Sequence, residues 1–216
     1  MTFSKAVIII SHVPIVLTFI YVGLISKKLS HELKVFSYYI FFTSTIQFIS
    51  LAFWFMAKNN LPLLHLYVAG GFMLLAWFYN TILNSFINSR IIWSLAILFL
   101  VFTIVNTVFF QRIYEFNSNA VTVESILIII FALFTYTFFL NDIVKESTKH
   151  DIKSLNWINA GLFIYHSSTL IIFYFGTVIT QSFSKSLNQY TWVFNSFFSI
   201  VMYFCFFIGF WKRSKI

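Results

Sequence analysis

Seven long apolar runs, separated by short polar connections, constrain this chain more than any other feature of its sequence. A helix needs about 20 apolar residues to cross the hydrocarbon core of a bilayer, and backbone polar groups cannot remain unpaired in lipid. The runs therefore predict an all-α fold, a polytopic transmembrane bundle of about seven helices. The predicted helices lie near 6–26, 35–57, 63–88, 91–110, 122–140, 157–180 and 191–211.

The composition excludes an ordinary soluble domain. Only 9% of the 216 residues are charged and 60% are hydrophobic, whereas soluble domains carry about 25% charged residues. No connection is long enough for a soluble domain, so residues 1–216 are interpreted as a single transmembrane domain. The first run lacks a small-residue cleavage site, and we expect it to remain as an uncleaved first helix.

The Lys and Arg residues are distributed unevenly between the two sides of the predicted bundle. Ten of the fourteen fall in the first, third and fifth connections and the C-terminal tail, and four fall on the other side. Because cytoplasmic connections carry the excess of positive charge, we expect a multi-pass cell-membrane protein with its N-terminus outside and its C-terminus in the cytoplasm. The net charge of +8 suits anionic lipid headgroups, and no spacing indicates nucleic-acid binding.

Polar side chains within the apolar runs mark the faces that we expect to point into the bundle, because polar groups are costly in lipid. One interpretation is that they hydrogen-bond between helices, at about 1 kcal/mol for each contact. The alternative is a polar cavity for a ligand or a transported solute. The candidates for interhelical contacts are Gln47, Asn80, Asn84, Asn106 and Asn195.

Four ionisable residues, His12, His65, Glu115 and Glu124, lie towards the predicted outer side of the membrane. They form a candidate extracytoplasmic ligand site, in which His65 and Glu124 could pair or hold a metal or a polar ligand. The alternative is that each side chain lies in water at the level of the lipid headgroups.

The sixth run adds two candidate ligand-binding residues. Asn159 and His166 are seven residues apart and therefore lie on one side of a helix. A histidine near the membrane midplane is a functional candidate, and its ordinary pKa suits a proton switch. The alternative is a neutral imidazole that bonds to a facing Asn or Ser.

No motif identifies a reaction or a cofactor. The chain lacks HExxH, CxxC, GxSxG and P-loop patterns, and the seventh run has no lysine that could form a retinal Schiff base. The single cysteine, Cys205, cannot form an intrachain disulfide and is interpreted as a small buried hydrophobe. We therefore expect no cofactor, and the sequence leaves the question of a metal open.

Three stretches resemble a group of small seven-helix membrane proteins common in Bacteroidota. They are Phe110–Ser118 (FQRIYEFNS) continuing through Thr122–Ser125, Asn156–Tyr165 (NWINAGLFIY), and His65-Leu66-Tyr67. The resemblance covers the whole length and implies an inner-membrane location without implying a reaction. This chain departs from the pattern at Gly71, where a Glu often follows His-x-Tyr, and at His166-Ser167-Ser168, where Phe-Ser-Gly is usual. If that Glu is functional, this member differs in its ligand or lacks the activity.

Four functions remain open: a sensor or receptor-like module, a small transporter, a membrane lipid enzyme, and a scaffold or assembly factor. The seven helices and the outer-side ionisable groups favour the first. Because no output domain is attached, a sensor would need a cytoplasmic signalling partner, for which the charged connection 141–156 is the candidate surface. The other expected partner is the lipid bilayer, no nucleic-acid partner is expected, and the oligomeric state is not indicated.

Overall fold

In the computed structural model, the described part of the chain comprises residues 3–141 and 151–213, and its regular secondary structure is entirely helical. The all-α prediction is thus confirmed. The elements are α1 (Phe3–Ile10), α2 (His12–Ile25), the 3-10 turn η1 (Ser26–Lys28), α3 (His31–Phe55), α4 (Leu61–Leu83), α5 (Ser89–Phe109), α6 (Ser118–Leu140), α8 (Ile152–Tyr174), α9 (Gly176–Ser182) and α10 (Lys185–Trp211).

Six spans in the described ranges are long and apolar enough to cross a membrane, and the bent pair α8 and α9 makes a seventh if it is counted as one span. Their outer faces are apolar: Leu24 and Leu140 are each 80% exposed, as side chains that face lipid would be. Most helices begin a few residues before the predicted apolar runs. Polar residues form these first turns, which an apolar pattern does not detect.

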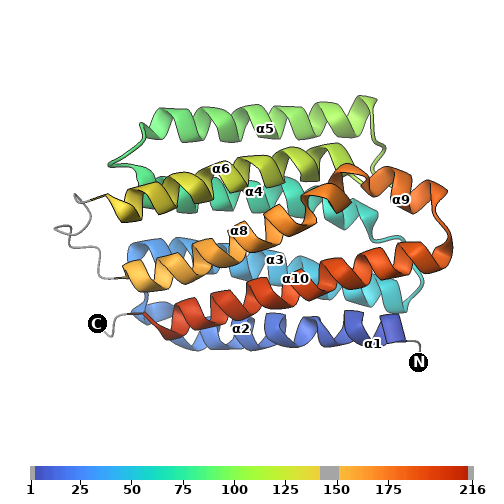
Figure 1. Ribbon diagram of the computed structural model, residues 1–216, viewed down its shortest axis with the longest axis horizontal. Coiled ribbons are helices and arrows are strands. Elements are labelled where there is room, and N and C mark those ends of the chain that lie inside the picture. Colours follow the sequence, from blue (N-terminus) through green and yellow to red (C-terminus); the bar gives the residue numbers. More distant parts are fainter. Residues whose placement is uncertain (1–2, 142–150, 214–216) are drawn as a thin grey trace.

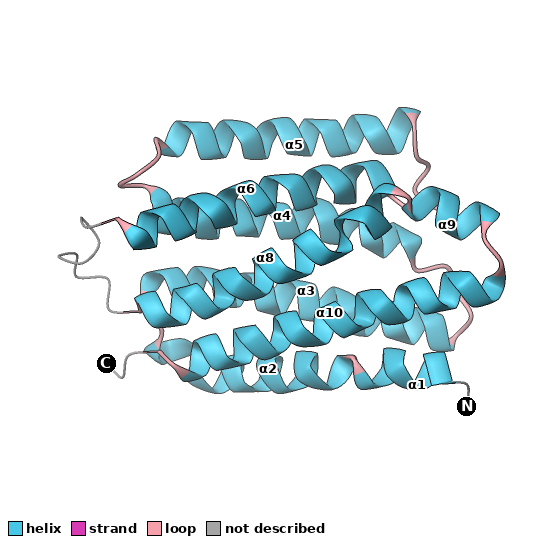
Figure 2. Cartoon of the chain, in the orientation of Figure 1, coloured by secondary structure: helices cyan, strands magenta, loops and turns pink. Residues whose placement is uncertain are grey.

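Six of the helices close into a ring, and the seventh lies outside it. Neighbours around the ring are α2, α3, α4, α6, α8 and α10, and α10 packs back against α2. Helix α5 packs only along α4 and α6, at one edge of the bundle (Figures 1 and 2). The two chain ends lie at opposite ends of the bundle (Figure 1), which fits an odd number of crossings.

The first and sixth spans are each interrupted. Ser11 separates α1 from α2, because Pro14 has no backbone N–H to donate to the carbonyl of Ile10, four residues earlier. At this break two side chains bond to the carbonyl of Ile8: the Oγ of Ser11 at 2.7 Å and the Nδ1 of His12 at 2.8 Å. In the sixth span, α8 and α9 meet at an angle of 50°.

Aromatic side chains fill the ring at the end where the chain terminates. Phe36, Phe78, Phe206 and Phe210 are all fully buried. The ring centroid of Phe36 lies 4.8 Å from that of Phe78 and 4.9 Å from that of Phe206. In lipid such packing, rather than removal from water, holds helices together. The filled half leaves the opposite half of the ring as the place where a cavity can form.

Glycines allow α8 and α10 to pack closely beside this aromatic cluster. A Cβ added to Gly161 would lie 2.8 Å from the Cβ of Cys205 and 3.0 Å from the carbonyl oxygen of Met202. A Cβ added to Gly209 would lie 2.8 Å from Ile158. Small residues at these points let the backbones approach each other, as is common in membrane helix pairs.

We therefore expect Gly161→Ala to lower the free energy of unfolding by about 1–3 kcal/mol, because the added methyl overpacks the contact. Gly23→Ala is the matched control, since a Cβ there meets nothing within 4 Å. It should be neutral or should stabilise the helix by up to about 1 kcal/mol. Thermal unfolding of both purified variants in detergent measures the difference, and equal stability would contradict the close approach.

Candidate functional site

A cavity of about 570 Å³ lies inside the ring, at the end nearer the N-terminus. Its lining comes from α1, all six ring helices and α9, whereas α5 contributes nothing. It includes the last turns of α3, the first turns of α4, α6 and α10, and the end of α8. A volume of this size is ordinary for a small-molecule site, for which the usual range is about 300–1,000 Å³.

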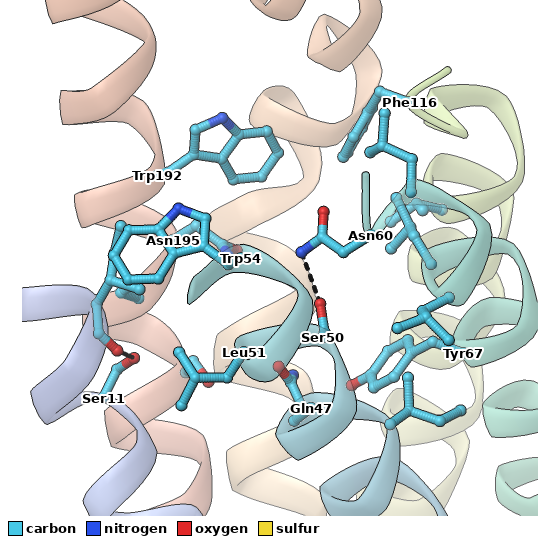
Figure 3. A pocket seen from close by; sticks show the side chains of 18 of the residues that line it. Ser11, Gln47, Ser50, Leu51, Trp54, Asn60, Tyr67, Phe116, Trp192 and Asn195 are labelled. Atoms are coloured by element: carbon cyan, nitrogen blue, oxygen red, sulfur yellow. Dashed lines mark hydrogen bonds between the residues drawn. The ribbon is translucent and has the colours of Figure 1, made fainter. Parts of the chain in front are cut away.

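Aromatic side chains form much of the cavity wall. In Figure 3, Trp54 and Trp192 lie on one side, and Phe116 and Tyr67 lie on the other. The rings of Phe116 and Trp192 are 5.2 Å apart, centroid to centroid. A hydrogen bond of 2.7 Å from the side-chain amide of Asn60 to the hydroxyl of Ser50 links the wall between α3 and the start of α4.

Glu124 is the acidic residue of the lining, and its side chain is only 3% exposed. It lies six residues after the start of α6. A Cβ on Gly71 would be 3.9 Å from its Oε1, so the absence of a side chain at Gly71 leaves room beside the carboxylate. Within the described residues, Glu124 has neither a hydrogen bond nor an ion pair. Buried carboxylates are normally paired, which makes this one exceptional.

Tyrosines from three helices lie within electrostatic range of the carboxylate. Tyr39, Tyr67 and Tyr165 all lie close enough to Glu124 to interact with it electrostatically. The hydroxyl of Tyr165 donates a hydrogen bond to Oδ1 of Asn195 at 3.2 Å, which joins α8 to α10. The carboxylate thus faces aromatic rings and neutral hydroxyl groups rather than a positive charge.

His166 also lines the cavity and is 5% exposed. Its Nδ1 is 3.0 Å from the Oγ of Ser125, which itself donates to the carbonyl of Val121 at 2.8 Å. Because that hydroxyl proton is already engaged, Nδ1 of His166 acts as the donor, and Nε2 is left as the acceptor of a neutral ring. Ser125 is fully buried outside the lining, so the pair is not arranged as an exposed nucleophile and its base.

Of the six predicted ligand-binding residues, the structure brings three to the cavity: His12, Glu124 and His166. Two of the residues predicted as interhelical contacts, Gln47 and Asn195, also line it. Gln47 has no hydrogen bond within the described ranges. Its amide therefore remains available to a bound molecule.

The other three predicted ligand-binding residues lie outside the cavity. His65 does not pair with Glu124: its Nε2 donates to the backbone carbonyl of Glu115 at 3.2 Å, and its Nδ1 is 2.9 Å from the hydroxyl of Thr107. Asn159 bridges two other helices, accepting from Tyr79 at 3.2 Å and donating to the carbonyl of Ala132 at 3.1 Å. His65 lies at the depth of the cavity but bonds to Thr107, whereas Asn159 lies seven residues, about 10 Å, nearer the start of α8 than His166.

A metal site is not formed by the histidines and carboxylates in the described ranges. No three or more His, Cys, Asp or Glu side chains come together there in a way that could hold an ion. The idea that His65 and Glu124 share a metal is therefore corrected, because His65 is engaged by Thr107 and by the connection between α5 and α6.

The expectation of interhelical contacts also fails for Asn80 and Asn84. Asn84 is exposed at the end of α4, and Oδ1 of Asn80 is buried without a hydrogen-bond partner. For Asn106 the expectation is confirmed, because its bond to Asn119 joins α5 to α6. Its amide donates to Gln111 at 3.0 Å and to Asn117 at 2.8 Å, and its oxygen accepts from Asn119 at 2.9 Å.

This amide network fixes the wall of the cavity at Phe116. The amide of Gln111 donates to Ser118 at 2.7 Å and to Thr177 at 3.0 Å, and the hydroxyl of Thr177 bonds to the carbonyl of Phe116 at 3.2 Å. The end of α5, the start of α6 and α9 are thereby held together. Within the stretch FQRIYEFNS, Phe116 thus forms part of the wall and Gln111 holds it in position. The charged side chains of this stretch, Arg112 and Glu115, do not line the cavity.

Sequence reasoning did not select Tyr67, Tyr165, Trp54, Trp192 or Phe116 as site residues. In an apolar chain with 31 Phe, 11 Tyr and 6 Trp, aromatic residues are too common to single out. Tyr165 directly precedes His166, and Trp192 is three residues before Asn195. The only available indication was therefore the proximity of these rings to polar residues at helical spacing.

We expect Gln111→Ala to lower the free energy of unfolding by about 1–3 kcal/mol, because it leaves several buried polar groups without partners. Gln181→Ala on the exposed surface of α9 is the control and should change stability by no more than about 0.5 kcal/mol. Thermal unfolding in detergent provides the measurement. If both variants unfold at the wild-type temperature, the network does not hold the wall.

Comparison with known proteins adds no assignment to this site. No protein-family model matches the chain, and neither a curated protein nor a solved structure shows significant similarity to it. The cavity and its lining are therefore the basis on which a function is inferred.

Proposed function

We propose that this protein is a receptor-like membrane module that binds a small ligand in the cavity of the helix ring. One observation carries the proposal: Glu124 is buried without a partner at a cavity large enough for a small molecule. An uncompensated buried carboxylate costs free energy. A ligand that pairs with it would offset that cost.

The proposed topology has seven spans, with α8 and α9 as one bent span, in a cell inner membrane. We place the N-terminus outside and the C-terminus in the cytoplasm because most Lys and Arg residues fall on the C-terminal side. The ligand would then reach the cavity from the extracytoplasmic side. A cytoplasmic signalling partner would bind the protein and respond to its conformation, with the connection 141–156 as the candidate contact surface. Residues 142–150 of this connection lie outside the described ranges.

A ligand in this position would touch most of the bundle at once, since the lining draws on every helix of the ring. If the helix ring can adopt two packing arrangements, a ligand that binds one of them more tightly shifts the population towards that arrangement.

The proposal for transport is weaker, because the helix ring beyond the cavity is filled by Phe36, Phe78, Phe206 and Phe210. A lipid enzyme is less well supported because Ser125 does not line the cavity.

The topology can be tested by cysteine labelling. The native Cys205 is only 6% exposed, so background labelling of the wild-type protein should be low. We expect a membrane-impermeant maleimide to label Ser182→Cys in intact cells and Lys28→Cys only after the membrane is broken. Both positions are exposed and lie at opposite ends of the bundle. The reverse labelling pattern would invert the proposed orientation.

Ligand binding can be tested by the thermal stability of the purified protein against metals, lipids and small metabolites. A ligand that binds the native state should raise the free energy of unfolding by about 2.7 kcal/mol at 100 times its Kd. Ser199→Phe, which fills the cavity, should abolish the increase, whereas Ser167→Phe on an exposed face of α8 should retain it. The proposal fails if no compound stabilises the wild type, or if Ser199→Phe responds equally.

A further inference from the structure

The charged groups that face the cavity are unbalanced. Glu124 is the acidic residue of the lining, and none of the lining residues is a Lys or Arg. The remaining ionisable side chains there are His12, His166 and two tyrosines. The Nδ1 atoms of both histidines already bond to protein oxygens. The carboxylate of Glu124 therefore has no fixed counter-charge in the wall.

The walls around this carboxylate are aromatic. Tyr67 and Tyr165 lie near Glu124, and Trp54, Trp192 and Phe116 continue the lining. The faces of aromatic rings carry negative potential, so they attract cations within about 6 Å of the ring centre. A carboxylate together with several aromatic rings is the combination that recognises ammonium groups.

We infer that the cavity binds an organic cation, in which an ammonium group pairs with Glu124 and an apolar body packs against the aromatic walls. This inference rests on the proposed function and adds the chemical class of its ligand. The volume of about 570 Å³ accommodates a body well beyond the ammonium group itself.

Other ligand classes fit the lining less well. An anion would meet Glu124 without a Lys or Arg to bind it. A calcium ion takes 6–8 oxygen ligands and a structural zinc ion takes four protein ligands, but the described residues bring no cluster of that kind together. A neutral molecule would leave the carboxylate without a counter-charge.

The polar lining also suits an N–H donor. Nε2 of His166 is an acceptor when Nδ1 donates to Ser125, and the amide oxygen of Gln47 has no donor among the described residues. Asn195 is already engaged by Tyr165. A protonated amine supplies up to three donors, which these acceptors could share with Glu124.

Matched pairs of compounds test the charge requirement. Phenethylamine is compared with 2-phenylethanol and 3-phenylpropionate, and choline with its neutral isostere 3,3-dimethylbutan-1-ol. Affinities are measured by titration of the thermal shift and by calorimetry in a non-ionic detergent. We expect the cation of at least one pair to bind at least tenfold more tightly than its neutral isostere.

Variants separate the charge from the rest of the site. Glu124→Gln should weaken the cation at least tenfold and leave the neutral isostere unchanged. Glu115→Gln, a carboxylate outside the cavity, should change neither. The ligand-free Glu124→Gln protein should unfold at or near the wild-type temperature, because Glu124 makes no hydrogen bond or ion pair within the described ranges that the substitution would remove. Tyr67→Leu, which removes one aromatic ring, should weaken the cation more than the neutral compound.

The outcomes distinguish this inference from the proposed function. Tight binding of the neutral or anionic compounds, lost in Ser199→Phe, would overturn the cation class and leave the cavity as a ligand site. The inference also falls if no cation stabilises the wild type, or if Glu124→Gln keeps the preference for cations. Loss of every ligand response in the wider screen would remove the proposed function itself.

Discussion

The exclusion of polar groups from lipid is the constraint on which the rest of this structure depends. Backbone groups in a bilayer must bond within their own helix, and polar side chains must find partners inside the bundle. Leu24 and Leu140, each 80% exposed, represent the outer face that satisfies lipid. Gln111 and Asn106 show how polar side chains are accommodated inside the bundle, since each of their amides bonds to several neighbouring side chains.

Glu124 stands apart from that solution. Most buried polar side chains of this bundle bond to a neighbouring helix or to a carbonyl of their own helix, as Thr43 and Asn159 do. A carboxylate is costlier to bury in its charged form than a hydroxyl or an amide, and Glu124 has no partner in the described ranges. Stability alone would favour Gln or an apolar residue here, so the carboxylate is better understood as a binding group whose partner arrives with the ligand.

One half of the helix ring is filled by side chains that stabilise the fold, and the other half contains the proposed ligand site. Towards the C-terminus, Phe36, Phe206 and their aromatic neighbours fill the interior, and Gly161 and Gly209 bring α8 and α10 close together. Towards the N-terminus the same helices enclose the cavity. The bend between α8 and α9, held through Thr177 to the carbonyl of Phe116, completes the wall at that end. A rigid half supporting a hollow half is a suitable arrangement for preorganised binding.

Length and apolarity of the runs determined the helical class, the approximate spans and the end of the bundle at which Glu124 and His12 lie, because these depend on local spacing alone. Rotation of each helix about its axis was decided only by tertiary packing. His65 and Glu124 lie at similar depths in sequence terms, but packing of α4 against α5 turns His65 to Thr107. Asn159 shares a face of α8 with His166 but lies seven residues nearer the start of that helix, about 10 Å along its axis, where it bonds to Tyr79 and does not line the cavity. The aromatic walls also could not be predicted from the sequence. An aromatic side chain becomes part of a site only when helices that are distant in the chain pack together and place it near a charged group.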